Sequence, residues 1–127
     1  MCVEVNWGID IHIPDPNISK FFPGQEFKAV AVHYDKEKAP PFSVPYRCLY
    51  SRNISNLFMA GRHISTTHVA HAATRVQRYT GTYGEVVGIA ASLCRKYETN
   101  PRGLYETYLQ ELKKALADGV PASEITN

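Results

Sequence analysis

The sequence has little of what would assign it to a specialised class of protein. Its three cysteines include no CxxC pair, which disfavours a disulfide framework and a cysteine-rich zinc site and favours reduced, structural thiols. No apolar run approaches the roughly 18 residues of a membrane span. The 14 basic and 12 acidic residues leave a formal charge of +2, too small to indicate a nucleic-acid partner. We therefore expect one globular domain that binds neither nucleic acid nor a membrane.

Residues 1–50 are predicted to be rich in β-structure. Apolar and polar residues alternate over residues 3–13, which predicts a half-buried strand with Trp7 on its apolar side. A second alternating segment, residues 27–34, predicts an antiparallel partner for this strand. The prolines between residues 40 and 45 predict an extended connector that stays outside any sheet.

Residues 51–98 are predicted to form a strand, a loop and a long helix. The run 57–60 (LFMA) is apolar throughout, which is typical of a strand buried on both faces. The capping-box pattern of residues 74–77 (TRVQ) predicts that the helix begins at Thr74. Residues spaced by three and four positions predict one buried face as far as about residue 97, made of Val76, Tyr79, Thr80, Tyr83, Val86, Val87, Ala90, Cys94 and Tyr97.

Small residues run beside this buried face, at Gly81, Gly84, Gly88 and Ala91. Each glycine costs the helix about 1 kcal/mol of propensity, so we expect a compensating interaction. Without a side chain at these positions, a sheet, another helix or a flat ligand can lie directly against the backbone.

Residues 99–127 are predicted to be a C-terminal amphipathic helix. Asn100 is the expected cap, Pro101 the first helical residue and Gly119 part of the stop. Its apolar face carries Leu104, Tyr105, Tyr108, Leu109, Leu112 and Leu116. The isolated chain is therefore predicted to be α+β, with an antiparallel strand pair, a buried strand, a long helix and this final helix.

The segment 61–73 lies between the predicted buried strand and the predicted long helix. In open α/β sheets, ligands bind at this end of the strands. A helix N-terminus also offers free amides and a positive dipole end to a phosphate or another electron-rich group. The same pattern occurs in ordinary packing, so taken alone it leaves both interpretations open.

Five short motifs occur in one order along nearly the whole chain. They are IDIH followed by PD (9–15), VPYRCL (44–49), NLFMAGRHIS (56–65), THVA (67–70), and TRV (74–76) followed by Gly84 and Gly88. Together they resemble the C-terminal part of a bacterial family of FAD-dependent oxidoreductases with a glutathione-reductase-like cofactor domain. The resemblance implies that the strand 57–60 completes the FAD sheet. It also implies that the next loop passes the ribityl and pyrophosphate groups, and that the long helix points its N-terminus at the flavin pyrimidine ring.

The resemblance also implies roles for individual residues. The amides of Arg75, Val76 and Gln77 would stabilise the negative charge of a reduced flavin. His68 and His71 are candidate catalytic residues, as a proton donor or acceptor beside the flavin. The cofactor-binding candidates are Gly61, Arg62, Ser65, Thr74, Arg75, Val76 and Gln77.

Two departures from the wider superfamily qualify these expectations. Many relatives have an acidic residue after the glycine that binds the ribityl chain, whereas this sequence has Arg62, which would pair with a phosphate or form a structural ion pair. The GxGxxG fingerprint that holds the ADP half of FAD is absent. We therefore expect this chain to be the C-terminal piece of a longer oxidoreductase, binding FAD poorly or not at all by itself.

That longer parent is expected to transfer hydride or electrons between FAD and a small organic substrate. The isolated chain would be inactive and would self-associate through the surfaces left uncovered. Its compartment stays open, because a parent chain can carry a signal further upstream.

Two other interpretations remain. One is a non-enzymatic module that dimerises or docks without a cofactor. The other is a metal hydrolase that uses His63, His68 and His71 as ligands, which is disfavoured because no acidic or cysteine ligand lies near them in the sequence.

Overall fold

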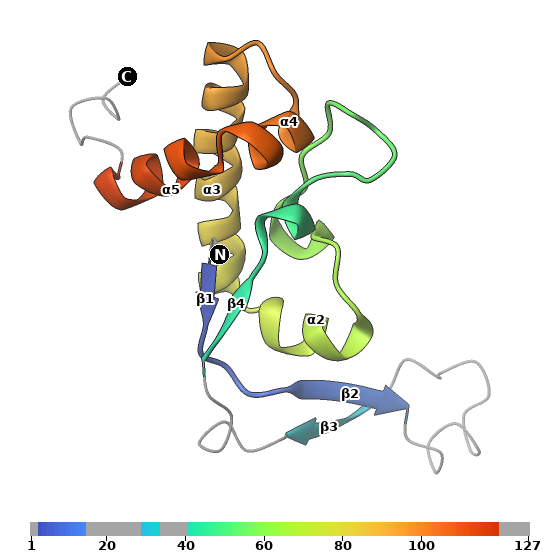
Figure 1. Ribbon diagram of the computed structural model, residues 1–127. Coiled ribbons are helices and arrows are strands. Elements are labelled where there is room, and N and C mark those ends of the chain that lie inside the picture. The colour runs from blue at the N-terminus through green and yellow to red at the C-terminus, as the bar shows by residue number, and fades with distance from the viewer. Residues whose placement is uncertain (1–2, 15–28, 34–40, 120–127) are drawn as a thin grey trace, which may run out of the picture.

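A computed structural model describes residues 3–14, 29–33 and 41–119 and confirms the α+β class (Figure 1). The predictions for residues 27, 28, 34, 40 and 120–127 lie outside this described part of the chain. None of the helices in the described part is long and apolar enough to cross a membrane.

The β-structure consists of two separate two-stranded antiparallel sheets. β1 (Val3–Val5) pairs with β4 (Phe42–Val44), and β2 (Asp10–Pro14) pairs with β3 (Ala29–His33). The predicted antiparallel pairing is thus confirmed for β2 and β3. One continuous strand over residues 3–13 is wrong, because residues 6–9 belong to neither sheet.

Two further predictions for this region are wrong. Trp7 is 42% exposed, because β1 ends at Val5 and the apolar side of the strand does not continue to it. The connector does join a sheet, through β4. Its prolines at positions 41 and 45 flank β4, so the backbone N–H groups inside the strand remain able to pair.

The apolar run 57–60 forms no buried strand in this chain, so that prediction is wrong here. It pairs with the segment before it at one isolated bridge, between Tyr50 and Phe58. Two hydrogen bonds flank this bridge, a 2.8 Å bond from the Met59 amide to the Leu49 carbonyl and a 2.9 Å bond from the Ser51 amide to the Leu57 carbonyl. Leu57 is 41% exposed. A strand inside a sheet needs backbone partners along both edges and packed layers on both faces, and the described residues supply a backbone partner along one edge only.

The predicted long helix is divided into α2 (His68–Thr74) and α3 (Gln77–Lys96). The cap of α2 is Thr67, whose hydroxyl accepts a hydrogen bond from the Ala70 amide. Thr74 ends α2 instead of starting a helix, and its buried hydroxyl donates to the Ala70 carbonyl. The capping-box prediction is therefore wrong, because an earlier threonine caps an additional helix and Val76 adopts an extended conformation between the two helices.

The C-terminal helix is also divided, into α4 (Pro101–Thr107) and α5 (Leu109–Asp118). Asn100 caps α4 by accepting from the Gly103 amide at 2.9 Å, as predicted. At the bend between the helices, the ring of Tyr108 stacks on that of Tyr97 with centroids 4.2 Å apart. Both helices cross one side of α3 (Figure 1).

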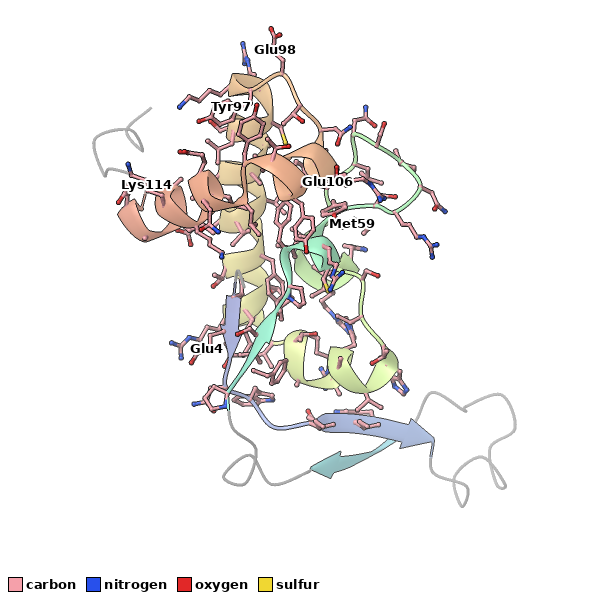
Figure 2. All side chains as sticks on the ribbon, in the orientation of Figure 1. Glu4, Met59, Tyr97, Glu98, Glu106 and Lys114 are labelled. Atoms are coloured by element: carbon pink, nitrogen blue, oxygen red, sulfur yellow. The ribbon has the colours of Figure 1, made fainter. Side chains whose placement is uncertain are left out.

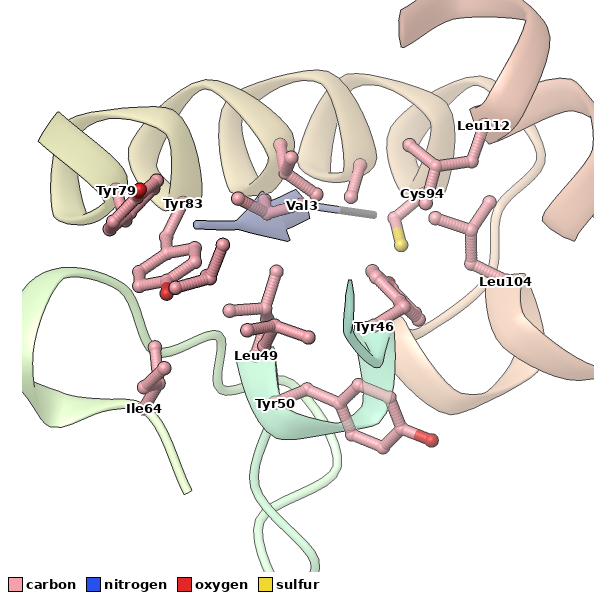
Figure 3. Close-up of a cluster of buried hydrophobic side chains, with 14 residues drawn as sticks. Val3, Tyr46, Leu49, Tyr50, Ile64, Tyr79, Tyr83, Cys94, Leu104 and Leu112 are labelled. Carbon is pink, nitrogen blue, oxygen red and sulfur yellow. The ribbon is translucent and has the colours of Figure 1, made fainter. Parts of the chain in front are cut away.

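One hydrophobic core unites all three predicted segments (Figure 3). The predicted buried face of α3 is confirmed at its centre, where Tyr83, Val86 and Ala90 are at most 1% exposed. β1, residues 61–63, α4 and α5 all pack against α3. Cys48 and Cys94 are free thiols. Besides Tyr83, Val86 and Ala90, the core contains Val3, Val5, Val44, Tyr46, Leu49, Tyr50, Ile64, Tyr79, Cys94, Leu104 and Leu112.

Candidate functional site

A cavity of about 290 Å³ lies between β2, α2 and the short 3-10 helix η3 (Gly61–His63). It brings together four residues predicted from the sequence, two arginines and two histidines, with the polar side of β2. The lining residues are Asp10, Ile11, His12, Arg62, His68, His71, Ala72 and Arg75.

Arg75 joins the two sides of this cavity. It occupies the break between α2 and α3, and its Nη2 atom lies 3.0 Å from Asp10 Oδ2 and 3.3 Å from the Asp10 carbonyl oxygen. His12 Nε2 lies 3.4 Å from Asp10 Oδ1 on the other side of the carboxylate. Sequence reasoning missed Asp10 and His12 as site residues, although both occupy the polar side of a strand whose apolar side was recognised.

Gly61 and Arg62 occupy the turn that leads into the cavity. Gly61 has a φ of +66°, a left-handed conformation that favours glycine over any residue with a Cβ atom. This backbone conformation begins η3 and places the exposed Arg62 at the cavity wall. Arg62 makes no ion pair with another described residue.

His71 is the more enclosed of the two histidines that α2 contributes to the cavity. Its Nδ1 atom lies 3.4 Å from Thr66 Oγ1. Burial lowers the pKa of His71 below its ordinary value of 6.5, and the nearby positive charges of Arg62 and Arg75 lower it further. The imidazole is therefore neutral at pH 7 and able to accept a proton.

The histidine cluster expected from the sequence does not converge. His68 is exposed at the start of α2 and lines the cavity, whereas His63 does not line it. Within the described ranges, no three His, Cys, Asp or Glu side chains lie close enough to hold a metal ion.

The remaining cofactor candidates lie outside this cavity. Ser65 lines a second cavity, and its amide donates to the Cys48 carbonyl at 2.9 Å. Thr74 is buried at the C-terminal end of α2. Val76 is the half-buried residue before α3, and Gln77 is exposed.

The amides available at the start of α3 differ from those expected. The Arg75 amide is used within α2, since it donates to the His71 carbonyl at 3.0 Å. The amides of Tyr79 and Thr80 both donate to the Val76 carbonyl. No side chain caps α3, so the open amides at its start are those of Gln77 and Arg78, together with that of the preceding Val76, which donates to no described residue. The N-terminus of this 20-residue helix, with its positive dipole end, is thus available. It begins about two residues later in the sequence than expected.

Comparison with known proteins identifies the family. A family model described as FAD dependent oxidoreductase matches residues 3–116. The chain belongs to this family. No curated protein and no solved structure matches the chain.

Membership in the FAD-dependent oxidoreductase family implies FAD, a molecule with a negatively charged diphosphate and a flat ring system. The described residues fit part of such a molecule. Arg62 lies beside a glycine turn and has no ionic partner among the described residues, and α3 begins without a side-chain cap. A Cβ atom added at Gly81, Gly84 or Gly88 would meet nothing within 4 Å, so this face of α3 is open for close approach.

Proposed function

We propose that this chain supplies the flavin-ring and ribityl side of the FAD site in a longer oxidoreductase, together with part of the substrate cavity. The observation that carries the proposal is the meeting of Arg62, His71 and Arg75 in one cavity next to the uncapped start of α3. FAD would supply the redox chemistry, by accepting or donating a hydride.

The two arginines have different roles in this proposal. Arg62, which has no ionic partner among the described residues, would pair with a phosphate of the cofactor. Arg75 is committed to Asp10 and would hold β2 against the site. Gly61 gives the turn its shape, and the amides of Gln77 and Arg78 would face negative charge on a reduced flavin.

His68 and His71, the two histidines of α2, would serve the substrate side. His71 is neutral because of its lowered pKa, so it can accept a proton from a substrate that is being oxidised. His68 is exposed at the cavity rim and would exchange that proton with solvent.

The proposal is tested first on the complete protein encoded by the same gene. An in-frame GxGxxG fingerprint upstream is expected, and the complete protein should bind FAD and be yellow. Arg62→Gln should weaken FAD binding by about tenfold, the usual effect of losing one charge-assisted hydrogen bond. Arg95→Gln, at the far end of α3, is the matched control. Absence of an upstream fingerprint, or equal effects of the two variants, would contradict the proposal.

A second test uses the 127-residue chain alone. Titration with FAD, followed by flavin fluorescence, should show no saturable binding at micromolar concentrations, because the unit that binds the ADP half is missing from its sequence. Tight binding of FAD by the isolated chain would contradict the view that it holds only one part of the site.

We also propose that the isolated chain self-associates. Leu57 is exposed beside an incompletely paired segment, and the small-residue face of α3 is open. Sedimentation velocity should detect dimers whose population falls when Leu57 is replaced by Gln. A non-enzymatic docking module would show the same dimers without FAD binding by the complete protein, so the flavin titration separates the two functions.

A further inference from the structure

A second cavity, of about 560 Å³, opens between the 3-10 helix η2 (Tyr46–Leu49), the loop that follows it and α4. None of its lining residues belongs to the cavity that contains His71. Its volume lies within the range of small-molecule sites, roughly 300–1,000 Å³. Met59 from the loop and Glu106 from α4 both line it, and they lie near each other in Figure 2.

Positive charge dominates this second cavity. Arg47, Arg52 and Arg102 line it, and Glu106 is the one acidic residue among the described residues of its wall. The ion pairs between residues in the described part of the chain all involve Asp10, so these three guanidinium groups have no carboxylate partner there.

Arg102 is held in position by the loop. Its Nη2 atom donates a 3.0 Å hydrogen bond to the Arg52 carbonyl, which joins α4 to the loop at the edge of the cavity. The loop itself is fixed by Ser51, whose hydroxyl accepts the amides of Asn53 and Ile54. A guanidinium group has five N–H donors, so Arg102 keeps donors for a ligand after making this bond.

Two tyrosine rings form another part of the wall. The buried ring of Tyr46 packs on both, with centroids 5.3 Å from Tyr50 and 6.3 Å from Tyr105. The hydroxyl of Tyr50 points away from the core under α3 (Figure 3). Burial raises the pKa of this hydroxyl, the charge of Arg102 lowers it, and the carboxylate of Glu106 contributes a further rise.

We infer that this cavity binds a small organic anion in which a carboxylate or phosphate group is attached to a flat apolar body. Guanidinium forks pair with planar carboxylates and with phosphates through two parallel hydrogen bonds. Tyrosine rings provide a rigid apolar surface for the body of the ligand. The inference does not depend on the proposed flavin role, because that role uses none of the arginines and tyrosines that line this second cavity.

The test is a titration of the purified chain with phenyl phosphate and, separately, with benzoate, followed by amide chemical shifts at constant ionic strength. Saturable shifts are expected around Tyr50, Arg102 and Tyr105 and not around His71. Inorganic phosphate should bind more weakly than phenyl phosphate, because it lacks the apolar body. A comparison of the two organic probes shows which anionic group the site prefers.

Arg47→Gln should weaken binding of the preferred probe by about tenfold, the usual effect of losing one charge-assisted hydrogen bond. The Arg47 side chain is exposed, so the substitution should not disturb folding. Arg52→Gln is a second variant, because its backbone carbonyl still accepts the bond from Arg102. Arg95→Gln changes the net charge equally at an exposed position outside both cavities and should leave binding unchanged.

Three results would overturn the inference. One is the absence of saturation by either organic probe up to about 10 mM, a concentration above the dissociation constant expected of even a weak specific site. Another is an equal loss of binding in Arg47→Gln and Arg95→Gln, which would indicate unspecific attraction to positive charge. The third is displacement of the probe by FAD in the complete protein, which would make the cavity part of the cofactor site to which Ser65 was assigned from the sequence.

Discussion

The guanidinium group of Arg75 lies 3.0 Å from the carboxylate of Asp10, which precedes it by 65 residues. This ion pair joins the break between α2 and α3 to β2, and it forms one wall of the cavity that contains His71. The position of the β2–β3 hairpin over α2 (Figure 1) therefore depends on a polar contact in addition to apolar packing.

Arg75→Gln should destabilise the chain by about 1 kcal/mol, because a partly buried carboxylate loses its charged partner while solvent still screens the pair. Urea unfolding followed by circular dichroism measures this change. The matched control is Arg78→Gln, which removes the same charge from an exposed position three residues later. Equal midpoints for the two variants would mean that the ion pair does not stabilise the fold.

His71 should titrate below pH 6.5 in the folded chain, because burial and neighbouring positive charge oppose its protonation. Since the unfolded chain takes up this proton more readily, stability is fully present above pH 6.5 and falls as the pH drops through the lowered pKa. Proton NMR of the imidazole measures the midpoint. Arg62→Gln should raise it by removing one of the charges, whereas Arg95→Gln should not. A midpoint at or above 6.5 in the unmodified chain contradicts the assignment.

Tyr83 makes stability sensitive to alkaline pH. Burial raises the pKa of its hydroxyl from 10.0 to about 12, and the hydroxyl donates to the Thr74 carbonyl at 3.3 Å. Between pH 10 and 12 the unfolded chain loses a proton that the folded chain keeps, so stability should fall by roughly 2 to 3 kcal/mol across this window.

Tyr83→Phe should remove that part of the alkaline decline and should cost about 1 kcal/mol at pH 7 through the lost hydrogen bond. Denaturant unfolding at pH 7, 10 and 11.5 measures both effects. Tyr97→Phe is the control, because Tyr97 is only half-buried and stacks on Tyr108. An identical pH dependence in Tyr83→Phe and the unmodified chain would exclude this role.

Local sequence signals predicted the helices better than they predicted the boundaries between them. The spacing of Tyr79, Tyr83 and Ala90 gave the buried face of α3 correctly, because every third or fourth residue of a helix shares a face. The break before α3 was missed because both Thr67 and Thr74 are acceptable caps by residue type. Only the structure shows that Thr67 accepts an amide while Thr74 donates to a carbonyl.

Contacts between distant segments could not be predicted from local patterns. The alternation over residues 3–13 contains no signal that divides it between two sheets, since β1 and β2 are separated by their different partners. In the site, Arg62, His68, His71 and Arg75 lie within fourteen residues of sequence, so their clustering followed from the loop and helix prediction. Asp10 was missed because its role depends on its contact with Arg75, which is 65 residues away in the sequence.

Glycine substitutions separate the stability of the isolated chain from the needs of the proposed parent. Gly88→Ala should stabilise the isolated chain by up to about 1 kcal/mol, because alanine favours the helix and nothing lies within 4 Å of the added methyl group. Gly61→Ala should destabilise it by about 1 kcal/mol, because the Cβ atom of alanine makes a φ of +66° sterically unfavourable. Urea midpoints for both variants test these opposite signs.

The same Gly88→Ala substitution has a different expected outcome in the proposed longer oxidoreductase. If the rest of that protein or its flavin lies against this face of α3, the methyl group should collide there, and FAD binding or thermal stability should fall. A gain of stability in both the isolated chain and the complete protein would show that the face stays open. The glycines would then have no packing role, and their cost to the helix would have no compensation in the proposed FAD site.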